Sequence, residues 1–144
     1  MKNLESDLFL YRRQLSQLAQ AQNIELCIKR TLYWTITGGG RTYAYTQQGK
    51  YYQEPVPSGE TVHTIIVWCG ANLGEYHELR HAEQRLTNPH WHGTTLAQLE
   101  LEATQKALSY PSLELTVLFN LWFNYAFYSL THRIKPNGNS ERQL

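Results

Sequence analysis

The sequence predicts one α/β (α+β) domain in which helices pack on a single mixed sheet, with the element order α-βββ-α-α-β-α. Hydrophobic residues recur at helical spacing near the N-terminus, alternate as in β-strands over the next third, and then return to helical spacing. With 144 residues, the chain is long enough for one core and too short for two ordinary domains. We expect a single domain, 1–144, made of an N-terminal helix (1–23), a three-stranded meander (27–70), helices with one strand (71–134) and a polar tail (135–144).

Composition narrows the class of protein. Charged residues make up 17% and the formal net charge is +1, which is typical of a soluble globular chain and unlike a strongly basic nucleic-acid-binding protein. Cys27 and Cys69 lie far apart with no metal-type spacing, so we expect free thiols in a reducing, cytoplasmic compartment. Glu5, Asp7 and Arg12 interrupt the N-terminal region where a secretory signal needs an apolar run, so we expect no targeting segment.

The first predicted element is a helix near 4–22. Leu8, Tyr11 and Leu15 recur at steps of three and four residues, which places them on one stripe of a helix. The stripe is expected to cover the sheet. In the alternative interpretation it forms a short heptad seam, and the protein is a homodimer through its N-terminal helix.

Three antiparallel strands are expected next, at 27–36, 41–53 and 61–69, because β-branched and aromatic residues dominate these segments. The triple glycine at 38–40 predicts a turn that joins the first two strands as a hairpin, since glycine adopts positive φ freely. Two prolines in "EPVPSGE" end the second strand, and Gly70 ends the third.

Helical spacing returns over 73–86 and again over 95–108, where Thr94 or Thr95 can cap the second helix and Pro111 ends it. The alternation in "LELTVLF" predicts a fourth strand at 113–119, followed by a helix capped by Asn120. The uncharged run from Leu115 to Thr131 is slightly short for a bilayer span and contains Asn120 and Asn124. We therefore expect it in a core or an oligomer interface and not in a membrane.

The segment "HELRH" carries the most specific pattern. It fits H-E-x-x-H, in which two histidines one helical turn apart bind zinc and the glutamate between them acts on water. This pattern resembles the zinc-metallopeptidase signature. The resemblance implies His77 and His81 as zinc ligands and Glu78 as the catalytic base. In the smallest families of this kind a glutamate on the next helix is the third ligand, which implies Glu100 or Glu102.

The same segment has a plainer interpretation. Arg80 lies between the two histidines, where a cation near the metal would repel it. A surface helix with paired side chains, such as Glu78 with Arg85, would produce the same letters. Without further support, no cofactor is expected, and zinc stays the alternative.

Two further motifs overlap this region. "HAE" at 81–83 resembles half of the nucleoside-deaminase site, but that chemistry needs a downstream P-C-x-x-C and both cysteines lie upstream, so a deaminase is excluded. "HWH" at 90–92 resembles the histidine pair of single-strand endonucleases, which implies a metal beside a tyrosine nucleophile such as Tyr125 or Tyr128. Pro89 before the motif and "GTT" after it do not suit the central strand that this family uses.

A wider set of landmarks resembles the ribonuclease H fold from Thr31 onward: "LYWTIT" as its first strand, "GGGRTYAY" as the start of its second, "TTLAQLELEATQKAL" as its first helix and "LTVLFN" as its fourth strand. The resemblance implies four carboxylates that bind two Mg²⁺ ions. Only Glu100 is retained. The other positions fall on residues 35–37, on Asn120 and on the last two residues, none of them acidic, so two-metal catalysis is excluded.

Aromatic and basic residues gather on the predicted hairpin. Alternate strand residues share a face, so Tyr43 and Tyr45 lie together, with Tyr51 on the same strand and Arg41 and Lys50 nearby. Such a surface can stack bases or anchor a protein. We therefore expect a non-catalytic binding or adaptor module, with a protein partner or self-association favoured over nucleic acid. A zinc-dependent hydrolase is the alternative, and the endonuclease a minor one.

Overall fold

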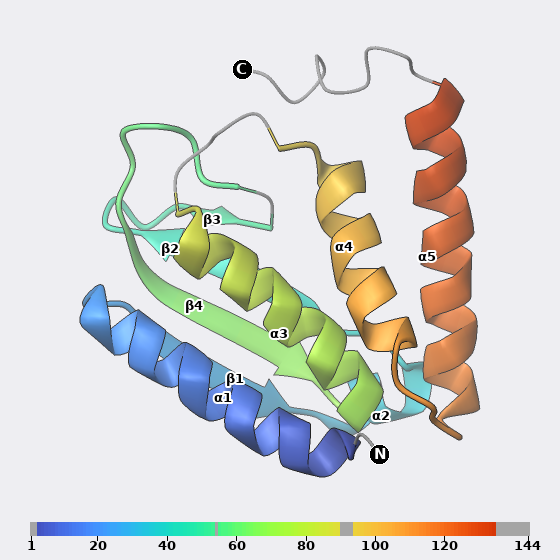
Figure 1. The fold of residues 1–144 in the computed structure, drawn as a ribbon. Helices are drawn as coiled ribbons and strands as arrows, with labels where there is room; N and C mark the ends of the chain where they lie inside the picture. Colours follow the sequence, from blue (N-terminus) through green and yellow to red (C-terminus); the bar gives the residue numbers. More distant parts are fainter. Residues whose placement is uncertain (1–2, 54, 90–93, 135–144) are drawn as a thin grey trace.

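The computed structural model describes residues 3–53, 55–89 and 94–134 (Figure 1). It contains one four-stranded mixed sheet and five helices, which confirms the predicted fold class. The elements are, in order, α1 (Leu4–Ala21), β1 (Glu25–Arg30), α2 (Leu32–Thr37), β2 (Arg41–Thr46), β3 (Tyr51–Tyr52), β4 (Val62–Cys69), α3 (Asn72–Thr87), α4 (Leu96–Leu108) and α5 (Leu115–Ile134).

The strands lie in the order β1-β4-β2-β3. β1 runs parallel to β4, whereas β2 is antiparallel to both β4 and β3. Helices α1 and α3 cover one face of this sheet, α4 packs beside α3, and α5 packs beside α4 on the side away from α1 (Figure 1). The helices thus form a layer whose order across the sheet is α1, α3, α4, α5.

The core lies between the sheet and this helical layer. Ala44, Ile65 and Val67 point from β2 and β4 into it and are fully buried. The predicted stripe of α1, which includes Leu8 and Leu15, packs on the same core. The stripe is therefore occupied within the chain, and a homodimer seam would need other residues.

The predicted three-stranded meander is wrong in its pairing. β1 and β2 do not form a hairpin, because β4 lies between them. The segment 31–37, expected to end the first strand, is the short helix α2. The hydroxyl of Thr31 accepts a hydrogen bond from the Trp34 N–H and caps the helix, and the hydroxyl of Thr35 donates to the Thr31 carbonyl. These local hydrogen bonds outweigh the β propensity of the sequence.

The second predicted strand, 41–53, is two strands joined by a tight turn. β2 ends at Thr46, whose N–H donates to the Lys50 carbonyl, and Gly49 adopts a φ of 83° in the turn. Tyr45 of β2 then pairs with Tyr51 of β3. The third predicted strand, 61–69, corresponds to β4.

The helices predicted at 73–86 and 95–108 are confirmed as α3 and α4, and Thr95 caps α4 by accepting from the Gln98 N–H. The strand predicted at 113–119 is wrong, because Leu115–Ile134 is one helix. Val117 and Leu121 are its buried residues, one helical turn apart, a spacing that the short alternating run concealed. The fourth-strand landmark of the ribonuclease H resemblance is therefore helical.

The residue just before α5 caps the N-terminal end of α3. Ala71, the residue before α3, makes no side-chain cap, and the carboxylate of Glu114 instead accepts hydrogen bonds from the N–H groups of Asn72 and Leu73, at 3.1 and 2.7 Å. A carboxylate at this end also favours the helix dipole. Among the described residues, no helix has the length and apolarity needed to cross a membrane.

Candidate metal centre

The "HELRH" segment occupies the middle of α3 and is buried. Helix α3 lies between the sheet and α4, so its polar residues face protein on both sides. His77, Glu78 and His81 are 5%, 7% and 5% exposed, and their potential ligand atoms all lie within 4.8 Å of one another. The three residues form a cluster that could hold a metal ion. A surface helix with the same letters would leave them in water.

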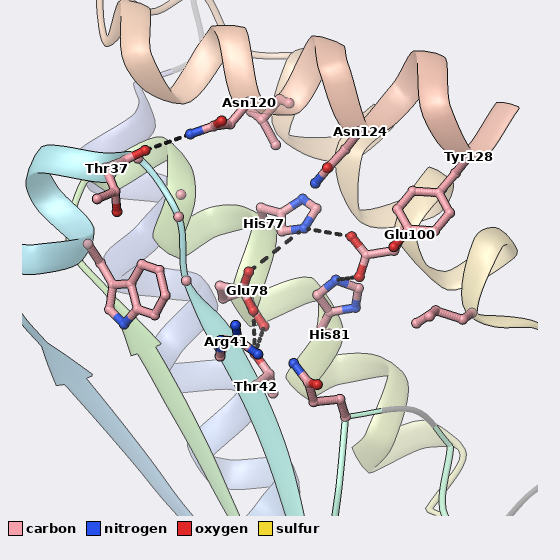
Figure 2. A pocket seen from close by; sticks show the side chains of 18 of the residues that line it. Thr37, Arg41, Thr42, His77, Glu78, His81, Glu100, Asn120, Asn124 and Tyr128 are labelled. Carbon is pink, nitrogen blue, oxygen red and sulfur yellow. Dashed lines mark hydrogen bonds and ion pairs between the residues drawn. The ribbon is translucent and has the colours of Figure 1, made fainter. Parts of the chain in front are cut away.

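Glu100 of α4 joins this cluster from the opposite side (Figure 2). One carboxylate oxygen lies 2.8 Å from Nε2 of His81, and the other lies 3.5 Å from Nε2 of His77. Two ligands of a tetrahedral zinc ion, each about 2.0–2.1 Å from it, are about 3.3 Å apart. The spacing of these atoms is therefore close to that of a zinc ligand set.

Gln84 fixes the protonation pattern of His81. Its amide nitrogen donates to the Leu99 carbonyl at 3.1 Å and to the Glu102 carboxylate at 3.0 Å, so its amide oxygen is the atom 2.8 Å from Nδ1 of His81. Because a carbonyl oxygen only accepts, Nδ1 carries the hydrogen, and in the neutral ring Nε2 presents a lone pair. Nε2 faces a Glu100 oxygen 2.8 Å away, and either a proton on Nε2, which makes the ring an imidazolium, or a metal ion between the two atoms satisfies this contact.

Glu78 is held beside the cluster by the sheet. The hydroxyl of Thr42 on β2 lies 2.8 Å from one carboxylate oxygen of Glu78 and 3.0 Å from its backbone carbonyl. The other carboxylate oxygen is 3.8 Å from Nε2 of His77. Glu78, the catalytic base that the H-E-x-x-H pattern implies, thus lies next to His77, and Thr42 of β2 sets its orientation.

Charges within the cluster are unbalanced toward the negative. Burial alone would lower the pKa of His77, but the hydrogen bond that His77 donates to Glu100 and the charges of Glu78 and Glu100 outweigh it and raise that pKa. Burial would raise the pKa of Glu100, yet the charge of His81 and hydrogen bonds from both histidines lower it. Burial lowers the pKa of Arg85 to about 10, although the charges of Glu78 and Glu100 act in the opposite direction. The two carboxylates leave room for further positive charge, from a protonated imidazole or a bound metal ion.

Arg80 does not enter the space between the histidines. Its guanidinium lies 2.9 Å from Glu83 of the same helix and 3.4 Å from Glu102 of α4. Glu102, the other predicted third ligand, is engaged with Arg80 and Gln84 and is not part of the cluster. The structure therefore brings together His77, Glu78, His81 and Glu100 and leaves Glu102 outside.

A cleft of about 710 Å³ opens onto the cluster. Its floor is formed by His77, Glu78 and His81 of α3 together with Glu100. One wall is formed by β2 and the glycine segment 38–40. Asn124 and Tyr128 of α5 extend over the cluster from the opposite wall (Figure 2). Burial and the negative charge of Glu100 raise the pKa of Tyr128, so its hydroxyl stays protonated and can donate.

Two glycines in this wall are needed for close packing. A Cβ on Gly40 would lie 2.7 Å from Cγ of Glu78 and 2.8 Å from the Trp68 carbonyl oxygen, and one on Gly39 would lie 2.9 Å from the ring of Trp34. Gly38, with φ of 75°, ends α2. The triple glycine was expected to be a hairpin turn. Instead, it allows the backbone to pack directly against the side chain of Glu78.

Sequence reasoning missed four residues of this region, namely Thr42, Gln84, Asn124 and Tyr128 in its role as a cleft residue. The position of Gln84 gave a usable signal, because a residue three positions after His81 lies on the same face of a helix. The other three come from β2 and α5, whose approach to α3 depends on tertiary packing.

The residues predicted for binding lie mostly elsewhere. Tyr43 and Tyr45 are half-buried on the face of β2 opposite the core, and both rings contact Tyr51, which is 62% exposed. Arg41 is exposed near the ring of Trp34 at the cleft, and Lys50 pairs with Glu60 in the turn region. The "HWH" motif falls within 90–93, outside the described residues.

A scan against protein-family models, a search of curated proteins and a search of solved structures each find no match for this chain.

Proposed function

We propose that this protein is a zinc-dependent hydrolase, similar to metallopeptidases, with His77, His81 and Glu100 as its zinc ligands. The observation that carries the proposal is the approach of the His81 Nε2 lone pair to a Glu100 oxygen at 2.8 Å, with the tautomer set by Gln84. A proton could also bridge these atoms. The surrounding pair of buried carboxylates, and a second imidazole nitrogen 3.5 Å from the same carboxylate, favour a doubly charged ion.

The donor set fits zinc better than the harder cations. Two imidazole nitrogens and one carboxylate are the ligands of a common catalytic zinc site, in which a fourth position stays open, whereas magnesium and calcium prefer oxygen ligands. Bound zinc would supply Lewis-acid polarisation of water and of a substrate carbonyl. The open position would face the cleft that α5 and β2 enclose.

Glu78 would act as the general base and then as the acid. Its carboxylate takes a proton from the attacking water while the oxygen of that water bonds to the carbonyl carbon. When the carbon–nitrogen bond breaks, Glu78 returns the proton to the leaving amine. The hydrogen bond from Thr42 keeps the carboxylate oriented for both transfers.

Asn124 and Tyr128 are suited to stabilise the developing oxyanion. Both line the cleft on the wall opposite β2, and both carry hydrogen-bond donors, the amide of Asn124 and the protonated hydroxyl of Tyr128. Donors held in a partly water-excluded site contribute more than they would in bulk water. An amide such as a peptide bond is the substrate class that this arrangement favours.

The experiment is a comparison of wild-type protein with Glu78→Gln in both zinc content and hydrolysis of a fluorogenic peptide mixture. We expect Glu78→Gln to keep its zinc, because Glu78 is not a ligand, and to lose activity by roughly 10²–10⁴-fold, the usual contribution of a general base. Activity that survives in Glu78→Gln, or a zinc-loaded wild-type protein that cleaves no peptide, would overturn the hydrolase assignment.

We also propose that the outer face of the sheet binds a protein partner, as a second function. Tyr43, Tyr45 and Tyr51 gather there, and no described helix covers them. Tyrosine supplies large contact area together with a polar group, which suits protein interfaces. Tyr45 does not line the cleft, so Tyr45→Ala should weaken capture of such a partner without a change in peptide hydrolysis. Equal capture by the wild-type and variant proteins would remove this role.

A further inference from the structure

Helix α5 has two different sides. Val117 and Leu121 are buried against the rest of the protein, and Asn120, Asn124 and Tyr128 reach the cleft. The opposite side carries six large apolar side chains that are between 49% and 73% exposed, namely Leu115, Phe119, Trp122, Phe123, Phe127 and Leu130. We call these six residues the outer face of α5. Exposed aromatic side chains at this density mark an interaction surface.

Nothing in the described chain covers the outer face. Helix α5 lies at the margin of the molecule, with α4 on its inner side and no other element beyond it (Figure 1). The short α2 contacts α5 near its N-terminal end, where Asn120 donates to the Thr37 carbonyl. Within the described part of the chain, the outer face is therefore uncovered.

We propose that the outer face of α5 binds the same face of a second copy of this chain, so that two α5 helices pair across a twofold axis. A twofold interface requires a surface that is complementary to itself. Phe119, Phe123 and Leu130, with Ala126 between them, follow one another at steps of four, three and four residues. This spacing gives the continuous apolar seam along which two helices pack side by side.

The area of the outer face is sufficient for a stable pair. If a large apolar side chain has about 200 Å² of surface, the six residues at their observed exposures present roughly 700 Å². A standard-sized interface buries about 800 Å² on each partner. Residues that flank the seam would supply the small remainder.

The charge pattern favours a second copy over a lipid surface. No Lys, Arg, Asp or Glu occurs between Leu115 and Thr131. Helices that lie on membranes usually carry Lys or Arg beside their apolar face, where these residues meet anionic lipids. In α5 the polar residues Asn120, Asn124 and Tyr128 lie on the inner side and line the cleft, so they do not flank the apolar face. An uncharged face instead meets no like-charge repulsion from an identical copy.

Pairing would also affect the cleft wall. Asn124 and Tyr128 lie on the same helix as the outer face and directly follow Phe123 and Phe127 in the sequence. A partner packed against α5 would hold that wall against the cluster. The dimer itself rests on the exposed face alone and stands whether or not the protein binds zinc.

The test is sedimentation of the full chain over a range of protein concentrations, for wild type, Phe123→Glu and Phe9→Glu. Phe123 on α5 and Phe9 on α1 are 60% and 61% exposed, so the two substitutions place the same charge at equally exposed phenylalanines. We expect a concentration-dependent dimer for wild type and for Phe9→Glu. For Phe123→Glu the dimer dissociation constant should rise by roughly a hundredfold or more, since the new carboxylate would be buried at the seam.

Circular dichroism establishes that each variant is folded. A wild-type protein that stays monomeric at all concentrations would overturn the proposal, and so would equal weakening by Phe9→Glu and Phe123→Glu. Binding of the monomer to vesicles of mixed neutral and anionic phospholipid, lost in Phe123→Glu, would assign the face to lipid instead. If Phe123→Glu is unfolded, Leu130→Glu near the other end of the same face replaces it.

Discussion

Helices α3 and α5 each depart from the usual rule that polar side chains face water and apolar side chains are buried, but they do so in opposite ways. Helix α3 buries charged and polar side chains, with Glu75 fully buried and His77, Glu78 and His81 nearly so, whereas α5 leaves phenylalanine and tryptophan in water. In α3 the buried carboxylates of Glu75 and Glu78 meet partners from other elements, Arg12 of α1 and Thr42 of β2. In α5 the exposed phenylalanines stack on residues of their own helix, and no other described helix or strand lies over them (Figure 1). This difference is the basis of our two proposals, an internal site on α3 and an external contact on α5.

The largest effect is expected at a buried charge of α3. Glu75 receives two hydrogen bonds from Arg12, and Arg30 lies 3.1 Å from it, so one carboxylate ties α3 to α1 and β1. Removal of one partner from a buried ion pair costs about 3–5 kcal/mol. Because both arginines are partly exposed and can be solvated, Glu75→Ala should fall at the low end, about 3 kcal/mol, in urea unfolding. A loss below about 1 kcal/mol would show that the buried charges of α3 contribute little to the fold.

A smaller effect is expected where α3 orients a ligand. Gln84→Leu removes the acceptor of the His81 Nδ1–H and the donor to the Leu99 carbonyl. Loss of such a supporting contact weakens metal binding by about 10–100-fold. Competition for zinc with a chromophoric chelator measures the change. Gln98→Leu, an exposed residue of α4, is the matched control and should bind zinc as wild type does.

The pH dependence of stability separates the zinc-free and zinc-loaded proteins. The pKa of His77 is raised in the folded state, so its contribution to stability is present in full below its ordinary value of 6.5 and is lost as pH rises through the folded value. Unfolding of the chelator-treated protein should therefore become easier from pH 6.5 upward. Saturating zinc, which replaces the proton, should remove this loss. As a control, substitution of the exposed His63 by alanine should leave the change of unfolding free energy with pH as it is in wild type. If that change is the same with and without zinc, His77 is not a zinc ligand.

The smallest effect is expected on the outer face of α5. Phe127 is 49% exposed and stacks only on its own helix, against Phe123 and Tyr128. Phe127→Gln should change the unfolding free energy of the monomer by no more than about 0.5 kcal/mol, the range of ordinary surface substitutions. The measurement is urea unfolding at a concentration where the protein is monomeric. A loss of about 2 kcal/mol or more would place Phe127 in the core and weaken the contrast with α3.

The sequence allowed the class of fold, the helices α1, α3 and α4, and the strand β4 to be predicted, because their hydrophobic spacing is long and regular. The prediction failed where short segments fit two periods. "LYWTIT" has strand-forming residues but is capped as a helix by Thr31, and "LELTVLF" alternates over a few residues before it continues as α5. The parallel pairing of β1 with β4 depends on contacts between distant segments, which local spacing does not contain.

The candidate site was predictable to a similar degree. His77, Glu78 and His81 follow from one helical motif, and Glu100 was one of two glutamates expected on the next helix. The choice between Glu100 and Glu102 depends on how α4 is rotated against α3, and Arg80 and Gln84 engage Glu102 instead. Of the aromatic hairpin, expected to be the main functional surface, Tyr43 and Tyr45 lie on the face of the sheet opposite the core, whereas Arg41 and Tyr51 line the cleft at the cluster.

The most direct test of the account is elemental analysis of the protein purified without a metal-affinity tag, beside His81→Ala prepared in the same way. His81 contributes the nitrogen that faces Glu100, so its removal leaves two of the three ligands. The account predicts one zinc ion per wild-type chain and little zinc in folded His81→Ala. A folded wild-type protein that holds no zinc, even after dialysis against the metal, or equal zinc in both proteins, would contradict it.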